Sequence, residues 1–317
     1  MIEKADQVEK WLRALSFEGW KFSGALTEVS NSWLLERNED KIYVHLNSNW
    51  LCFTLPLRND AANSTFYKKC LELCHRSFMC KFSLSPDGKL LLQLEIPFQS
   101  LEKDQCYKAV DALNVYLKWY EALKSGQSSI HSQGANQIQI KSVRKKEYFP
   151  KESLVFYFNA IEHLNWRLKD DLGDNRWKAI YKGNDRPFIV YLYFNQYWVY
   201  FQIPILSETL DLRLQNDEYK MSLYSYLLKL NEHIYWTKFG INENGKILML
   251  LDIPLEKLDL DMFQHATKTI AKYANKFAYD IQIMANLSQE KKLFNLIPNQ
   301  LQLESADVLH QKEGISS

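Results

Sequence analysis

The sequence predicts an α+β protein built from two tandem repeats, and three observations lead to that prediction. Residues 87–97 read DGKLLLQLEIP and residues 244–254 read NGKILMLLDIP, so a turn pair, a basic residue, an apolar strand and a final Ile-Pro recur 157 positions apart. In both halves, segments with apolar residues at helical spacing alternate with segments of period two, which is typical of strands. The length of 317 residues fits about two domains.

Each half of the chain is expected to contain three helices. Apolar residues in these segments recur at three- and four-residue spacing, which is the pattern of a helix with one buried face. The expected ranges are 5–15, 65–76 and 103–123 in the first half and 152–164, 218–230 and 260–279 in the second. The equal order of the helices in the two halves agrees with a duplication.

Two hairpins are expected between the helices of each half. Alternating apolar residues predict the first hairpin over 42–55 and its copy over 190–203, at an offset of 148. One or two short strands precede it near 33–35 and 177–181. The second hairpin turns at Asp-Gly in the first half and at Asn-Gly in the second, and both dipeptides tolerate positive φ angles. Each repeat therefore reads helix, three or four strands, helix, two strands, helix.

The first hairpin has one apolar face, which must lie against helices, and one aromatic face with polar tips. The aromatic face carries Tyr43, His45, Trp50, Cys52 and Thr54 in the first half and Tyr191, Tyr193, Trp198, Tyr200 and Gln202 in the second. Rings with polar tips suit a contact surface. The candidate binding residues are Tyr43, Trp50, Tyr191, Trp198 and Tyr200. The alternative is that the same side chains pack the two repeats against each other.

The two repeats are expected over residues 1–125 and 150–284. Between them, residues 126–149 are rich in Ser, Gly, Gln and Asn and include the basic run 141–146, which predicts a flexible linker. Residues 285–317 form a tail whose end is expected to be disordered.

The composition is that of an ordinary globular protein and excludes several classes. With 46% hydrophobic and 24% charged residues and a net charge of +1, the chain has no overall field that favours nucleic acid or a membrane surface. The basic run 141–146 is interpreted as part of a solvated linker rather than as a nucleic-acid contact. Residues 188–206 carry no charge, but Asn195, Gln196 and Pro204 favour a buried hairpin over a membrane span. Because the start has no secretory signal, we expect a cytoplasmic protein without a membrane span.

No motif in the sequence identifies an active site, a cofactor or a metal. All 5 cysteines lie in the first half, and Cys70, Cys74 and His75 could form a metal site on one helical turn. The second half has Leu227 and Asn231 at the equivalent cysteine positions, which favours buried thiols that act as small hydrophobic side chains. We therefore expect no enzymatic activity, no cofactor and no metal.

The charges of the repeated strand are expected to lie on a solvated face. Lys89 and Glu95 in the first copy correspond to Lys246 and Asp252 in the second. Their alternation with apolar residues is typical of a hairpin strand that has one face in water.

The order of helices and strands, together with the strand-ending Ile-Pro pairs at 96–97 and 253–254, resembles the YbjN-like and type III secretion chaperone-like family of α+β domains. The resemblance covers residues 1–125 and 150–284. It implies helices packed on one face of a twisted antiparallel sheet, and two such repeats in one chain would form an internal pseudo-dimer. It also implies binding of other proteins rather than catalysis, and it supplies no functional residues that can be carried over.

The sequence therefore predicts a non-enzymatic protein-binding module, chaperone-like or regulatory, that holds a partner polypeptide on its aromatic sheet surface. Two alternatives stay open. One is a structural subunit of a larger assembly, and the other is a small-molecule-binding or enzymatic domain with a pocket between the repeats. The expected partner is another protein rather than nucleic acid.

Overall fold

The computed structural model of the protein describes residues 2–15, 19–26, 31–58, 63–98, 101–125, 151–195, 197–206 and 217–286. The predicted linker over 126–149 and all but the first two residues of the predicted tail over 285–317 lie outside these ranges.

The first repeat contains three helices and six strands in the predicted order. They are α1 (Ile2–Arg13), β1 (Lys21–Ala25), β2 (Ser32–Arg37), β3 (Asp40–Leu46), β4 (Trp50–Pro56), α2 (Ser64–Arg76), β5 (Cys80–Leu84), β6 (Leu90–Pro97) and α3 (Lys103–Lys124). The expected helices at 65–76 and 103–123 agree with α2 and α3 to within one residue at each end.

The second repeat has the same helices and strands, and the structure also describes two 3-10 turns in it. They are α4 (Lys151–Ala160), η3 (Glu162–Leu164), β7 (Trp166–Gly173), β8 (Arg176–Lys182), β9 (Pro187–Phe194), β10 (Trp198–Pro204), α5 (Asp217–His233), β11 (Thr237–Ile241), β12 (Ile247–Pro254), η5 (Leu255–Lys257) and α6 (Leu260–Asn286). Helix α6 continues seven residues beyond the expected end at 279.

The twelve strands form two antiparallel sheets of six strands each. The order is β1-β2-β3-β4-β6-β5 in the first sheet and β7-β8-β9-β10-β12-β11 in the second, so equivalent strands occupy equivalent places. The fold is therefore α+β with two tandem repeats, as the sequence predicts. The segment 188–206 forms the β9–β10 hairpin within the second sheet.

The same turn chemistry closes the first hairpin of both repeats. The Asn47 side-chain oxygen accepts hydrogen bonds from the backbone N–H groups of Asn49 and Trp50. The Asn195 oxygen accepts bonds from the backbone N–H groups of Tyr197 and Trp198 in the same way. An asparagine side chain that satisfies the turn backbone fixes the register of the hairpin. The predicted apolar face of the hairpin is accordingly buried in both repeats.

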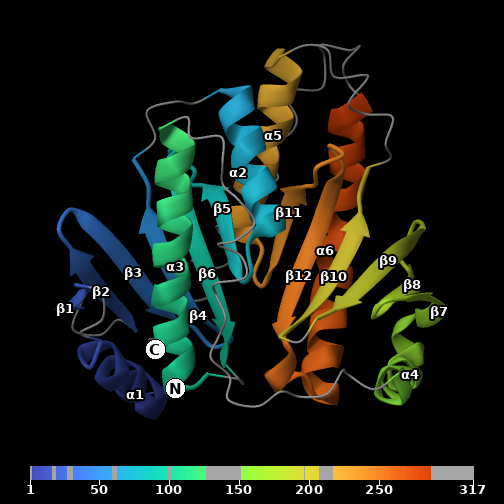
Figure 1. Ribbon diagram of the computed structural model, residues 1–317, viewed down its shortest axis with the longest axis horizontal. Helices are drawn as coiled ribbons and strands as arrows, with labels where there is room; N and C mark the ends of the chain where they lie inside the picture. Colours follow the sequence, from blue (N-terminus) through green and yellow to red (C-terminus); the bar gives the residue numbers. More distant parts are fainter. Residues whose placement is uncertain are drawn as a thin grey trace, which may run out of the picture.

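The two sheets lie side by side, and α2 and α5 stand together between them (Figure 1). Helices α1 and α3 accompany the first sheet, and α4 and α6 accompany the second. The central helices cross over, because α2 packs on β11 of the second repeat and α5 packs on β5 of the first. Each edge strand next to the centre is thus covered by helices on both faces.

Side-chain directions on β11 show this double cover. Phe239 points to α6, where its ring meets the ring of Phe277. Gly240 points to the other face, and a Cβ atom there would lie 2.8 Å from the backbone nitrogen of His75 on α2. The helix of one repeat therefore approaches the strand of the other so closely that only glycine fits. On β5 and β11 a helix of the other repeat adds to the cover that each repeat's own helices give its sheet.

Candidate functional site

The contact between the repeats is organised around two equivalent helix residues, Cys74 on α2 and Asn231 on α5. The Asn231 oxygen accepts a 2.6 Å bond from the N–H of Phe239, and its Nδ2 donates to the Phe239 carbonyl at 3.1 Å. The same Nδ2 donates to the Phe82 carbonyl on β5 at 3.0 Å. The Cys74 sulfur accepts a bond from the Phe82 N–H at 3.1 Å. The backbone groups of Phe82 on β5 and Phe239 on β11 are thereby satisfied, so a further strand cannot pair with these edge positions.

Two buried lysines cross the contact at equivalent positions of β5 and β11. Lys81 is 1% exposed, pairs with Glu95 at 2.5 Å and donates to the carbonyl of Ile234 in the other repeat. Lys238 is 4% exposed and pairs with Asp252 at 2.5 Å.

Each ammonium group therefore has acceptors from both repeats. Lys238 also donates to the Ser77 carbonyl at 2.5 Å and to the Cys80 carbonyl at 3.4 Å, both in the first repeat. Buried charges persist only when they are paired and hydrogen-bonded. These bonds consequently fix how one repeat sits on the other.

The expectation that Glu95 and Asp252 lie on a solvated face is wrong. Glu95 is 5% exposed and Asp252 is 7% exposed, because the central helices and the opposite repeat cover the face that water would occupy in a single repeat. Burial raises the pKa of Glu95 even though the Lys81 charge opposes that change. Lys89, by contrast, is exposed beside Asp87 in the hairpin turn.

Of the five candidate binding residues, Trp50, Trp198 and Tyr200 lie between the repeats. Trp50 stacks on Tyr235 at 5.9 Å between ring centroids. Trp198 stacks on Phe78 at 5.4 Å, and Tyr200 meets the same ring at 5.6 Å. Trp50 and Trp198 are almost fully buried. These three side chains therefore lie as expected from the alternative in which they pack the two repeats against each other.

The other two candidate residues, Tyr43 and Tyr191, lie on the outer part of the same sheet faces. Tyr43 on β3 is 38% exposed. Tyr191 on β9 is half-buried, and its ring lies 6.5 Å from the ring of Tyr193. Ile189, two residues before Tyr191 on the same face, is 44% exposed. The structure thus divides the predicted aromatic face into an inner part that joins the repeats and an outer part that stays accessible.

The two repeats differ in how they satisfy their buried tryptophans. In the first repeat, Trp20 donates to Asn114 at 2.8 Å and Trp33 donates to Glu9 at 3.0 Å. In the second repeat, the equivalent Trp166 and Trp177 are buried, and their indole nitrogens have no hydrogen-bond partner among the residues that the structure describes. Ala271 and Val155 stand at the positions of Asn114 and Glu9. The described part of the second repeat therefore lacks the counterparts of two internal polar contacts that the first repeat has.

The cysteines are packing residues in the part of the chain that the structure describes. Cys70, Cys74, Cys80 and Cys106 are buried and Cys52 is partly buried. Burial raises the pKa of the Cys52 thiol to about 12 and that of Cys74 to about 11, so both are protonated near neutral pH. Within the described ranges, no group of three His, Cys, Asp or Glu residues is placed to hold a metal ion.

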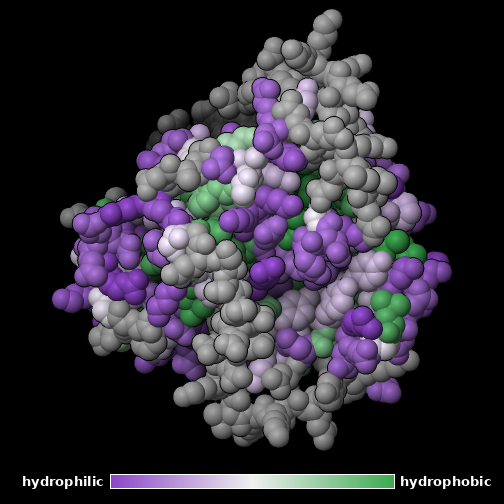
Figure 2. Space-filling view, turned by 45° about the horizontal axis from the view of Figure 1, so that its top comes forward, coloured by the Kyte–Doolittle hydropathy of each residue, from purple (hydrophilic) through white to green (hydrophobic). Residues whose placement is uncertain are grey.

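The coloured part of the surface in Figure 2 shows no single large apolar patch. There, hydrophilic side chains cover most of the coloured area and hydrophobic ones form small separate areas. No helix among the described residues has the length and apolar character needed to span a membrane.

The site and the fold together define a class: two α+β repeats in one chain that pack as an internal pseudo-dimer. The sequence matches no family model, and no curated protein matches it at a significant level. The residues that sequence reasoning missed are Lys81, Lys238 and Asn231. The sequence did contain a signal for the two lysines, because Lys81 and Lys238 recur at the 157-residue offset at equivalent positions of short strands.

Proposed function

We propose that the chain is a non-enzymatic protein-binding module, chaperone-like or regulatory, that holds a partner polypeptide on the outer sheet face of the second repeat. The observation that carries this proposal is the group of Ile189, Tyr191 and Tyr193 on β9. These side chains are accessible or half-buried and form one row at period two. The proposal includes the relationship to YbjN-like and type III secretion chaperone-like domains that the order of elements suggests.

The chemistry of this row suits a polypeptide. Tyrosine rings offer flat apolar area at low conformational cost, and their hydroxyl groups can bond to a partner backbone, which is why tyrosine is enriched at protein interfaces. In the first repeat, the equivalents of Ile189 and Tyr193 are Lys41 and His45, and Lys41 pairs with Glu36 at 3.0 Å. The fold therefore tolerates polar side chains at these places, and the aromatic row is not needed for the repeat to form.

The test is affinity purification from the native host with matched variants. The double variant Tyr191→Glu/Tyr193→Glu should lose a partner that the unchanged protein retains, while its melting temperature stays within a few degrees. Phe156→Glu is the control, because Phe156 is 59% exposed on α4, away from the sheet face. Equal capture by all three proteins would contradict the proposal.

A second pair of variants separates binding from packing. Charge substitutions at Trp198 and Tyr200 should destabilise the isolated protein, because these rings join the repeats. If Trp198→Glu instead left stability intact and abolished partner capture, the binding surface would lie between the repeats rather than on β9.

A further inference from the structure

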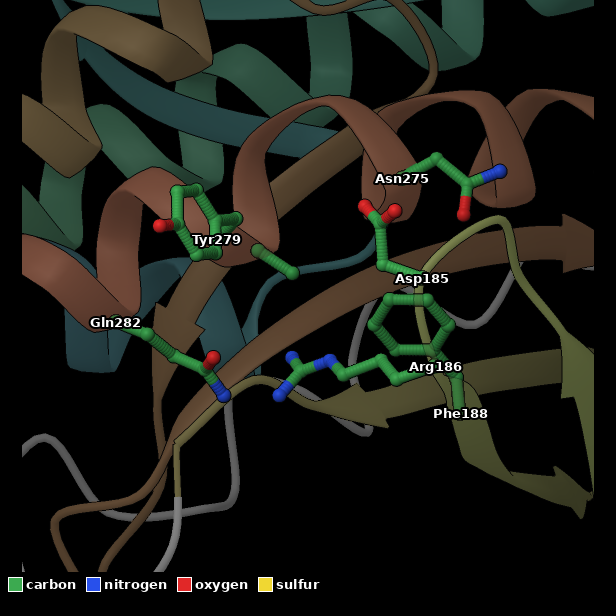
Figure 3. A pocket seen from close by; sticks show the side chains of 7 residues that line it. Asp185, Arg186, Phe188, Asn275, Tyr279 and Gln282 are labelled. Atoms are coloured by element: carbon green, nitrogen blue, oxygen red, sulfur yellow. The ribbon is translucent and has the colours of Figure 1, made fainter.

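A shallow pocket lies within the second repeat, between the β8–β9 turn and helix α6 (Figure 3). Asp185 and Arg186 line it from the turn and Phe188 lines it from β9. The residues that line it from α6 are Asn275, Ala278, Tyr279 and Gln282. Its cavity volume of about 40 Å³ holds a few water molecules or one small polar group.

Arg186 ends a stack of aromatic rings that begins in the core. Trp166 stacks on Tyr181 at 5.1 Å, and Tyr181 stacks on Phe188 at 6.1 Å. The Arg186 guanidinium lies 4.8 Å from the Phe188 ring centre. A guanidinium stacked on a ring keeps its in-plane N–H donors free for another partner.

The first repeat has a comparable guanidinium whose partners are all internal. Arg37 stacks on Trp20 at 4.5 Å. It donates to the Asn114 oxygen at 2.9 Å and contacts the Asp40 carboxylate at 3.5 Å. In the first repeat the chain itself thus supplies an amide and a carboxylate to the stacked arginine.

In the second repeat the corresponding internal partners are gone. Tyr181 stands in place of Arg37, Phe188 in place of Asp40 and Ala271 in place of Asn114. Arg186 has no ion pair with any described residue. Partial burial lowers the pKa of the Arg186 guanidinium, and no carboxylate of a described residue opposes this effect.

The turn that forms the pocket is hydrogen-bonded to α6 and is longer than its counterpart in the first repeat. The turn between β8 and β9 spans residues 183–186, against residues 38–39 in the first repeat. Asn275 donates to the Tyr181 hydroxyl at 2.7 Å and accepts from the Asn184 N–H at 3.2 Å, which pins the turn to α6. A Cβ atom on Gly183 would lie 2.5 Å from the Asn275 side chain, so the close approach requires glycine.

We propose that Arg186 binds a carboxylate group from outside the chain, supplied either by a small carboxylic acid or by a polypeptide. In Figure 3 the guanidinium extends towards the Gln282 side chain, while the Asp185 carboxylate points to the side of Asn275 and α6. The guanidinium fork matches a planar carboxylate with two parallel bonds. Gln282, whose amide nitrogen lies 3.5 Å from the Ile205 carbonyl, forms the far wall of this site.

The test follows the arginine Nε–H signals by NMR in the full chain during titration with two probes. The probes are propionate and the peptide N-acetyl-Gly-Gly-Gly with a free C-terminus, and the C-terminal amide of that peptide is the control ligand. We expect a saturable shift of the Arg186 signal with carboxylates and none with the amide. A response to propionate alone identifies a small acid, and a tighter response to the peptide identifies a polypeptide.

Matched variants complete the test. Arg186→Gln should weaken binding about tenfold or more, and Arg186→Lys should weaken it as well because the planar fork is lost. Arg167→Gln removes an exposed arginine of β7 and should change nothing. Two results would overturn the proposal: no response of the Arg186 signal to either carboxylate, or an unsaturable response that is equal in all variants. Neither depends on whether the β9 face binds a partner.

Discussion

The Nδ2 atom of Asn231 lies 3.7 Å from the Sγ atom of Cys74, the residue at the same position of the other repeat. Two equivalent residues touch only where a pseudo-twofold axis passes between them. That axis therefore runs between α2 and α5 (Figure 1). Both side chains form hydrogen bonds with backbone groups of Phe82 on β5 or Phe239 on β11, although one is a thiol and the other an amide.

Asn231→Leu should lower the free energy of unfolding by about 3 kcal/mol, because the buried N–H and C=O of Phe239 lose their partner and the C=O of Phe82 keeps only the thiol of Cys74. Urea denaturation followed by tryptophan fluorescence measures this. Asn159→Ala on the exposed side of α4 is the control and should stay within about 0.5 kcal/mol of the unchanged protein. A loss below about 1 kcal/mol would show that water or the thiol of Cys74 replaces the amide.

Lys81→Met should destabilise the protein by about 3–5 kcal/mol, because it leaves Glu95 buried without its ion-pair partner. The double variant Lys81→Met/Glu95→Leu should recover a large part of the loss, since an apolar pair of similar volume avoids the uncompensated charge. Chemical denaturation of the three proteins at neutral pH gives the comparison. If the double variant were as unstable as the single one, the bond from Lys81 to Ile234 would be the dominant contribution.

Glu9→Gln should destabilise the protein at neutral pH and lose its effect in acid. The indole of Trp33 and then Arg13 hold the pKa of Glu9 below its usual value. A carboxyl with a lowered folded-state pKa contributes stability above its unfolded pKa and loses it as the pH falls through the folded pKa. The variant should cost about 1 kcal/mol near pH 7 and almost nothing near pH 3. Denaturation curves at several pH values decide this, and a difference that persists in acid would contradict it.

Val155→Glu should stabilise the second repeat by about 1 kcal/mol at neutral pH, because it places a carboxylate where Glu9 bonds Trp33 and thus offers an acceptor to the unpaired indole of Trp177. The gain should disappear when the new carboxyl is protonated. Phe156→Glu adds the same charge one position along α4 and serves as the control. A similar gain in both variants would point to helix propensity rather than to the indole.

The order of helices and strands could be predicted because the two halves of the chain show the same sequence pattern. The hairpin turns at Asp87-Gly88 and Asn244-Gly245 and the stripes of α2 and α5 are local signals, and each copy confirms the other. The first strands, β1 and β7, were less clear. Most of β7 is exposed, with Lys169, Asp170 and Asp171 in its middle, so it lacks the alternation that marks a half-buried strand.

The sequence by itself determined the duplication, the two antiparallel sheets and the division of the first hairpin into an apolar and an aromatic face, because those follow from local periodicity. Only the tertiary structure decided which part of the aromatic face is accessible. Burial depends on what the opposite repeat covers: it takes Trp50, Trp198, Glu95 and Asp252 out of water and leaves Tyr191 at the surface. The sequence of β5 or β11 alone does not indicate that a helix of the other repeat will pack on it.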